Sequence, residues 1–385
     1  MRHRRQIILV VLSIPVLAWF LILALNWHSR LYRVTVLPKF KHRVVTPCAI
    51  NDHGQIVGSY EGRFLLWERD TGWRDLGESL EYLAINNRGQ IAGTLYNQPY
   101  EPGRHFQAFL WDPNDGLTML GTMGSSDSWA HGLNNLGQVV GLLWNNEDGR
   151  LSGEGERSGF IWSKAHGMRA LRMADGSPMA EWNASGMSIN DAGQIVGCCH
   201  RTTHESDFWQ HCLWRLTDDG LVLESVLPAN VSRSPNNHGY VIGWQGKPGG
   251  RQRYAFLWHQ DRGIEWLFPL EDPAPRGIVI GNLTSGLASV GPMNDSNQVA
   301  VWGVVHSSWL ERLTGKHFGP SRESFLWTRG KGQVFLDAYV LDAKGEYFVI
   351  HDINNTGSII GIVDSKAGGA RRAVLLEPIR GRWHK

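Results

Sequence analysis

One four-residue motif recurs seven times along this chain, and that repetition restricts the fold more than any other feature. The motif is Asn-[Asp/Asn]-x-Gly, and its copies begin at Asn51, Asn86, Asn134, Asn190, Asn236, Asn294 and Asn354. Asparagine at the first position caps a type I turn, and the fourth position needs a positive φ, which glycine adopts freely. The one copy without this glycine has Asn297, the next best residue there. We expect each copy to be a tight turn between two strands, and this turn chemistry to account for its asparagines.

A second signature, a short apolar strand that ends in tryptophan, follows each turn. Its six clear copies end at Trp67, Trp111, Trp162, Trp214, Trp258 and Trp327, and a seventh decays to Ala-Val-Leu-Leu at 373–376. A leucine lies nine residues after each of these tryptophans, with a glycine between the two. Each unit is therefore expected to contain four short strands in a meander. The mean period of about 50 residues is typical of one propeller blade.

The two ends of the repeat array predict how the ring closes. The chain has 385 residues, more than the ~250–300 residues at which a single hydrophobic core stops growing. A repeated architecture is therefore expected on length as well. The seventh unit lacks a fourth strand, and the β-rich segment 32–37 belongs to no unit, so we expect it to pair beside residues 373–377 and close the ring. The predicted fold is all-β: a seven-bladed β-propeller of four-stranded antiparallel blades over residues 32–377, followed by a tail at 378–385.

The segment before the propeller resembles a membrane anchor. Residues 7–25 form an uncharged run of 19 positions, preceded by Arg2, Arg4 and Arg5. A helix of that length reaches ~28 Å, close to the ~30 Å hydrocarbon core. A cleaved signal peptide is the alternative, but the run exceeds the usual h-region and no A-x-A cleavage site follows it. We expect a cytoplasmic N-terminus at 1–6, a signal anchor at 7–25 and a stalk at 26–31. The predicted location is the inner (plasma) membrane, with the propeller in the periplasm or outside the cell.

The repeats resemble those of a known family. The pairing of an Ile-Asn-x-x-Gly-Gln-Val-Val-Gly turn with an Ala-Phe-Leu-Trp strand is similar to the bacterial HAF family of extracellular repeats. The resemblance covers roughly residues 43 to 377. The family's histidine is replaced here by Gln107 and Tyr254, so no role for it carries over. The resemblance implies a location outside the cytoplasm and a propeller-like array, but no reaction, cofactor or catalytic set.

Loop lengths predict which rim of the ring binds a ligand. Because the strands alternate in direction, the turns at the asparagines and the fixed nine-residue connections share one rim, which we call the constant rim. The other connections share the opposite, variable rim. The separation from the glycine position of the second strand to the tryptophan position of the third ranges from 67 − 58 = 9 to 327 − 301 = 26 residues. Insertions confined to one face often mark the face that binds. Aromatic residues there could stack on a sugar ring or an extended peptide, or pin their own loops. These candidates are Tyr96, Tyr100, Trp144, Trp209, Trp244 and Trp309.

The sequence contains few motifs that indicate a disulfide, a metal site or a cofactor. Cys199, or its neighbour Cys198, falls on the strand adjacent to Cys212 in one hairpin. The pair is a candidate disulfide outside the cytoplasm, and free buried thiols are the alternative. His200 and His204 have metal-ligand spacing, but no complete zinc motif surrounds them, so no metal site is predicted. No nucleotide-binding, nucleophile-elbow or zinc-protease motif is present, and no cofactor is predicted. The charge balance of 38 − 36 = +2 argues against a nucleic-acid partner.

Three functional hypotheses follow from these features. The first is a membrane-tethered, non-enzymatic module that binds a glycan or protein at the cell envelope through the variable rim. The second is an envelope polysaccharide hydrolase or lyase that uses carboxylates of that rim. The third is a purely structural assembly module. The absence of a catalytic motif favours the first hypothesis and leaves enzymatic activity open.

Overall fold

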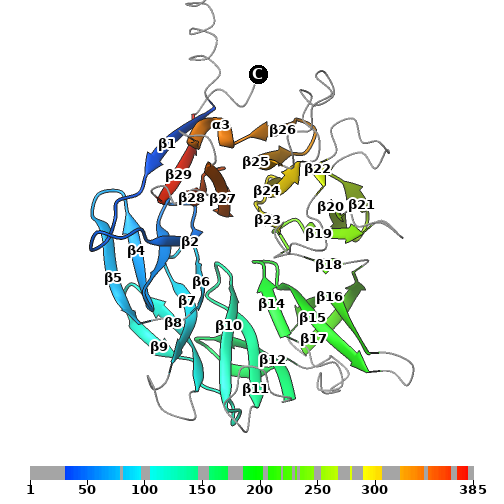
Figure 1. The fold of residues 1–385 in the computed structure, drawn as a ribbon. Helices are drawn as coiled ribbons and strands as arrows, with labels where there is room; N and C mark the ends of the chain where they lie inside the picture. The colour runs from blue at the N-terminus through cyan, green and yellow to red at the C-terminus, as the bar shows by residue number, and fades with distance from the viewer. Residues whose placement is uncertain are drawn as a thin grey trace, which may run out of the picture.

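The computed structural model contains seven small antiparallel sheets arranged in a ring around a central axis (Figure 1). It describes residues 31–78, 81–96, 105–145, 156–171, 185–202, 207–217, 220–227, 230–231, 235–246, 253–267, 278–279, 289–305, 321–341, 346–365 and 371–379. In most blades the chain runs from the innermost to the outermost strand in sequence order. The predicted all-β, seven-bladed propeller is confirmed.

The first four blades each hold four strands in chain order. Blade 1 contains β2 (Thr46–Ile50), β3 (Ile56–Tyr60), β4 (Arg63–Glu68) and β5 (Gly72–Glu78). Blade 2 contains β6 (Glu81–Ile85), β7 (Ile91–Tyr96), β8 (Phe106–Asp112) and β9 (Gly116–Met119). Blade 3 contains β10 (Asp127–Leu133), β11 (Val139–Asn145), β12 (Glu156–Ser163) and β13 (Gly167–Ala170). Blade 4 contains β14 (Ser185–Ile189), β15 (Gln194–Thr202), β16 (Asp207–Thr217) and β17 (Gly220–Val226).

The remaining blades depart from this pattern in two places. Blade 5 contains β18 (Asn230–Val231), β19 (Val241–Gly246), β20 (Arg253–His259) and β21 (Gly263–Trp266). Blade 6 contains β22 (Ile278–Val279), β23 (Ser289–Met293), β24 (Gln298–Val305), β25 (Ser321–Thr328) and β26 (Gly332–Phe335). Both β22 and β23 pair with β24, so this blade has five strands where the sequence predicted four. The short helix α3 (Asp337–Val340) then leads into blade 7 and was not predicted.

Blade 7 joins the two ends of the described chain. It contains β27 (Glu346–Ile353), β28 (Ile359–Ser365), β29 (Arg372–Pro378) and, as its outermost strand, β1 (Tyr32–Val36). β1 runs antiparallel to β29, with Tyr32 opposite Pro378 and Val36 opposite Val374. The pairing continues past both ends of β1, because Leu37 N–H donates to Ala373 O at 2.9 Å and Ile379 N–H donates to Leu31 O at 2.8 Å. The predicted closure by strand 32–37 is confirmed.

The hydrophobic core lies between neighbouring blades. One buried cluster combines Ala108 and Leu110 of blade 2 with Val139, Phe160 and Trp162 of blade 3. The third-strand signature thus supplies side chains to a sheet that is covered on both faces, which explains why it lacks apolar and polar alternation. Within blade 3 the second strand also lies close to the first. A Cβ added at Gly141 on β11 would lie 1.9 Å from Trp129 O on β10, so only glycine fits there.

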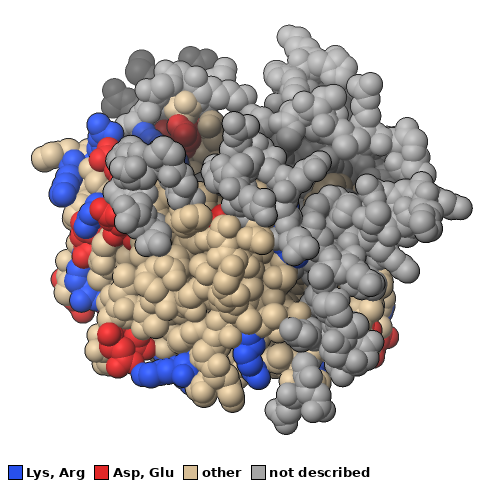
Figure 2. Space-filling view, turned by 90° about the horizontal axis from the view of Figure 1, so that it is seen from below, with Lys and Arg blue, Asp and Glu red and all other residues tan. Residues whose placement is uncertain are grey.

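Two further features concern the outside of the molecule. In Figure 2, which views the ring from below, described residues of both charge signs are interspersed around a central area of uncharged residues. Within the described part of the chain, no helix is long and apolar enough to cross a membrane. The predicted span at 7–25 lies outside that part.

Candidate functional site

The strand pairing assigns the connections to the two rims as the sequence predicted. Antiparallel pairing along each blade brings the turns at the asparagines and the turns between third and fourth strands to one rim. The connections between second and third strands, and those from each blade to the next, lie at the other. Long connections therefore collect on the variable rim, and many of their residues, such as 146–155 and 306–320, lie outside the described chain.

Two of the six predicted rim aromatics pack against neighbouring side chains in blades 2 and 3. The ring of Tyr96, at the end of β7, is half-buried and lies 5.0 Å from the ring of Phe106, which lies 4.1 Å from that of Trp129. Trp144, at the end of β11, is 5% exposed, and the Arg157 guanidinium lies 5.0 Å above its ring. Packing within the blades accounts for Trp144, so its face is not open to a ligand.

The structure describes the surroundings of only one of the other four predicted rim aromatics. Trp244 on β19 is partly buried against the core between blades 5 and 6. Tyr100 and Trp309 lie outside the described residues, as does the side chain of Trp209. Ligand binding by the rim aromatics stays a prediction.

The cysteine pair also stays a prediction. The register between β15 and β16 places Cys212 opposite Gly197 and Cys199 opposite Gln210. The two cysteines are therefore diagonal neighbours on adjacent strands. Cys212 is fully buried, while the side chain of Cys199 is not described. Among the described residues, no group of three or more His, Cys, Asp or Glu side chains is placed to hold a metal ion.

The constant rim has a feature that sequence reasoning missed: its seven turns are bonded into a closed ring. The first asparagine of each motif donates from Nδ2 to the backbone carbonyl of the first asparagine in the next blade, at 2.7–3.2 Å. The last of these bonds runs from Asn354 to Asn51 and completes the circle. In most copies Oδ1 also accepts the N–H groups of the third and fifth residues of its own turn, as Asn51 does at 3.1 and 3.0 Å. Turn chemistry alone therefore does not explain these asparagines, because their amides also join the blades.

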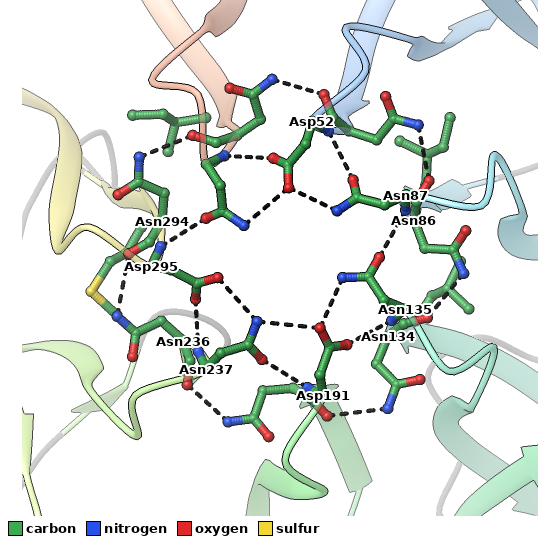
Figure 3. A pocket seen from close by; sticks show the side chains of 18 of the residues that line it. Asp52, Asn86, Asn87, Asn134, Asn135, Asp191, Asn236, Asn237, Asn294 and Asp295 are labelled. Carbon is green, nitrogen blue, oxygen red and sulfur yellow. Dashed lines mark hydrogen bonds between the residues drawn. The ribbon is translucent and has the colours of Figure 1, made fainter.

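A second ring of hydrogen bonds lies on the residues at the motif's second position (Figure 3). The backbone N–H of each donates to Oδ1 of the corresponding residue in the next blade, at 2.7–2.9 Å. Both Asn and Asp provide this acceptor. In ring order these residues are Asp52, Asn87, Asn135, Asp191, Asn237, Asp295 and Asn355.

The order of Asp and Asn in the second ring follows an electrostatic rule: no two aspartates are neighbours. Each carboxylate accepts side-chain amide hydrogens from asparagine beside it: Asp52 and Asp191 from both neighbours, and Asp295 from one. Asp191 Oδ2, for example, lies 2.8 Å from Asn135 Nδ2 and 3.2 Å from Asn237 Nδ2. A ring of seven can hold at most three carboxylates without placing two side by side, and this ring holds three. The arrangement pairs every charge with a donor and avoids contact between like charges.

The fifth residue of the motif region connects the first ring to the outer turns. In five blades it is glutamine, whose Oε1 accepts from the ring asparagine at 2.7–2.9 Å. Three of these glutamines donate in turn to a carboxylate near the outer end of the same blade, as Gln90 does to Asp112 at 2.8 Å. This bond, after one from the Asn114 N–H, helps to hold the pKa of Asp112 below its usual range.

Two exceptions to the repeat compensate for each other. Blade 5 has Tyr240 where most blades have glutamine, so Asn236 lacks the usual acceptor. Asn297 of blade 6 supplies it instead, because its Oδ1 accepts from Asn236 Nδ2 at 2.8 Å. Asn297 has a φ of 53° and takes the place of the turn glycine. The residue that the sequence explained only as a tolerated substitute for glycine thus supplies the missing acceptor of the buried Asn236 side chain.

The two rings surround a cavity of about 220 Å³ on the axis of the propeller. The Asn and Asp side chains of the two rings surround it (Figure 3), and the residues that precede them in sequence, such as Ile50 and Met293, also line it. These polar groups bond mainly to one another across blade boundaries. We therefore assign the axial rings to the stability of the propeller rather than to ligand binding.

Comparison with known proteins supports the fold and no more. No protein-family model matches the chain, and no curated protein matches it significantly. The chain is similar to the β-propeller domain of the Trilobed protease from Pyrococcus furiosus, with a TM-score of 0.53 and 11% identity over 87% of this chain and 95% of that chain. The fold is that of a β-propeller. The Pyrococcus furiosus domain is described as having an open velcro topology, whereas β1 and β29 pair in this chain.

Two further solved structures are less similar. An acylaminoacyl peptidase from Pyrococcus horikoshii gives a TM-score of 0.47 and 10% identity over 83% of this chain and 49% of that chain. A putative TolB from Agrobacterium tumefaciens gives a TM-score of 0.40 and 14% identity over 58% of this chain and 80% of that chain.

Proposed function

We propose that this protein is a membrane-tethered binding module of the cell envelope, which contacts its ligand through the variable rim. The contrast between the two rims carries this proposal. The constant rim is bonded into two closed rings whose polar groups are largely satisfied, while the variable rim collects the connections of unequal length. Loops on a rigid scaffold are the usual place for binding.

A protein ligand at the envelope is better supported than a glycan. Stacking on a sugar requires an exposed aromatic face, but Trp144 is 5% exposed and Tyr96 packs on Phe106. Long connections can instead contact a protein surface through many small interactions. The resemblance to HAF repeats favours a location outside the cytoplasm, and the apolar run at 7–25 supports a single membrane anchor.

Site-specific photocrosslinking in native membranes tests this proposal. A photoreactive amino acid replaces Tyr100 or Trp309 on variable-rim connections, and Asn114 or Arg262 on constant-rim turns as matched controls. Asn114 and Arg262 are both exposed, so the controls leave the core unchanged. We expect a discrete protein adduct from at least one variable-rim position and none from the controls.

The alternatives give different results in the same experiment. Adducts from the constant rim alone would contradict the assignment of the rims. Retention of the purified protein on isolated cell-wall polysaccharide, with no protein adduct, would indicate a glycan ligand. Release of soluble sugar from that material would indicate the hydrolase or lyase instead.

A further inference from the structure

Charge is distributed unevenly along this chain. Residues 1–51 contain eight Lys and Arg residues and no Asp or Glu, and the first acidic residue is Asp52. The other residues hold 38 − 8 = 30 Lys and Arg against all 36 acidic residues, a balance of −6. The N-terminal part is therefore attracted to an anionic surface that repels the rest of the chain.

Four of these eight cations belong to described residues, and three lie on a small hairpin between β1 and β2. In this basic hairpin, residues 38–43, the backbones of Phe40 and Arg43 exchange hydrogen bonds of 2.9 and 3.0 Å. Lys41 and His42 form its tip, with φ values of 46° and 69°. The side chains of Lys39, Lys41, His42 and Arg43 are exposed. Arg33, on the adjacent β1, is exposed as well.

The basic hairpin is fixed to the outside of blade 1. Trp73 Nε1 donates to Pro38 O at 2.7 Å, and the ring of Phe40 packs edge-on against that of Tyr60 at 5.4 Å. These contacts hold its base, so its cations keep a defined position on the edge of the ring. A fixed cluster of cations loses less conformational entropy on binding than a flexible tail does.

The cations of the basic hairpin are only partly neutralised. Arg43 forms an ion pair of 2.6 Å with Glu61, and both side chains are more than half exposed. Lys39 and Lys41 form no ion pair with any acidic side chain in the described part of the chain. The Lys41 ammonium lies 5.4 Å from the centroid of the Phe40 ring. The hairpin thus presents ammonium groups beside an aromatic ring, a combination that suits a lipid headgroup region.

Chain continuity places this surface near the predicted anchor. Only residues 26–31 separate the apolar run 7–25 from β1, and six extended residues reach at most ~20 Å. We propose that the basic hairpin docks on anionic phospholipid headgroups and so holds the edge of blades 7 and 1 toward the membrane. This inference rests on the membrane tether of the proposed function. It adds an orientation, because the axis of the ring then lies along the membrane plane.

Lysine labelling on defined vesicles tests the docking. The purified full chain is incubated with phosphatidylcholine vesicles or with vesicles that also contain about 30% phosphatidylglycerol, and amine acetylation is measured residue by residue. We expect Lys39 and Lys41 to react about fivefold more slowly on the anionic vesicles, with recovery in about 0.5 M sodium chloride. Lys164 on blade 3, whose side chain is 82% exposed, should react equally on both.

A variant and a second measurement distinguish failure of the headgroup docking from failure of the membrane tether. R33Q/R43Q removes two exposed cations but keeps both reporter lysines, and it should lose most of the protection. Resistance to alkaline carbonate extraction reports the tether independently. Carbonate resistance on both vesicle types with equal labelling would overturn the docking and leave the tether. Carbonate release with protection on anionic vesicles would overturn the tether and leave the docking. Absence of any vesicle binding would overturn both.

Discussion

The pattern of aspartate and asparagine in the second ring makes a strong prediction about Asn87. Its Nδ2 donates to Asp52 Oδ2 at 2.7 Å, and both side chains are half-buried. Asn87→Asp keeps the Oδ1 acceptor but places a second carboxylate against Asp52. The lost bond to a charged acceptor is worth about 1.5–3 kcal/mol. Two charges relaxed to ~4 Å repel by about 1 kcal/mol in water and about 4 kcal/mol at an effective dielectric of 20. Allowing for solvent screening, we expect the variant to lose about 2–4 kcal/mol of unfolding free energy.

A second substitution should restore this loss. In D52N/N87D the charge moves by one position, so the three carboxylates of the ring lie at positions 87, 191 and 295, again with no two adjacent. The amide at position 52 then donates to the carboxylate at position 87. The single variant D52N has no such compensation, because it leaves amide hydrogens facing one another. We expect the double variant to lie within about 1 kcal/mol of the wild type, although each single change destabilises.

Urea unfolding of the purified protein, followed by tryptophan fluorescence, measures all four members of this cycle. The cost of N87D should also shrink at low pH, where a protonated carboxyl again provides a donor, and at high salt, where repulsion is screened. Equal stability of N87D and the wild type would refute the electrostatic account of the ring. A double variant whose loss equals the sum of the single losses would refute the pairing on which that account depends.

Three further predictions follow from buried polar groups. Asn297→Gly removes one of the two acceptors of the buried Asn236 side-chain amide and should cost about 1–2 kcal/mol in urea unfolding. Adding Tyr240→Gln, which restores the usual acceptor, should recover part of this loss, and strict additivity of the two changes would contradict the compensation. Burial raises the pKa of Asp127, whose Oδ1 accepts the Phe106 N–H at 2.6 Å, so its stabilising contribution is present below the unfolded pKa and is lost as pH rises through the folded one. D127N, which keeps an acceptor, should therefore gain stability relative to the wild type as the pH rises from 4 to 8. Unfolding free energies of the two proteins that change in parallel with pH would contradict this role of Asp127. Burial raises the pKa of the Cys48 thiol to about 12, so iodoacetamide at pH 8 should modify it only after unfolding, as mass spectrometry can show.

The fold was predictable because its determinants are local and repeated. The turn asparagines, the turn glycines and the tryptophan strands specify one blade, and the unclaimed strand at 32–37 specifies the closure. What the sequence did not reveal are contacts between units. Asn51 donates to a carbonyl 35 residues away and Asn354 to one 303 residues away. No local sequence pattern specifies the carbonyl to which each of these amides donates. One signal was present, however: around the closed ring, no two successive motifs have aspartate at the second position.

The candidate site shows a related limit. Residue type and position placed Trp144 on the variable rim, but its 5% exposure depends on packing and on Arg157, which sequence periodicity does not report. Asn297 was explained by backbone conformation alone, because its hydrogen-bond partner belongs to the preceding blade. In both cases the type of residue was informative and its partner was not.

The two closed rings also explain why the other rim is free to vary. Closing a flexible loop becomes costlier by only ~0.6 kcal/mol for each doubling of its length. The longest connection between second and third strands, 306–320, has 15 residues and the shortest, 61–62, has two. This difference is just under three doublings and costs about 1.7 kcal/mol. One ring bond lost from a buried asparagine costs about 1–3 kcal/mol for a single substituted residue. A substitution at any one of the seven ring positions meets this penalty, whereas a whole inserted loop on the variable rim costs about as much as one such substitution. This asymmetry in free energy lets one end of the propeller diversify for binding without loss of the fold.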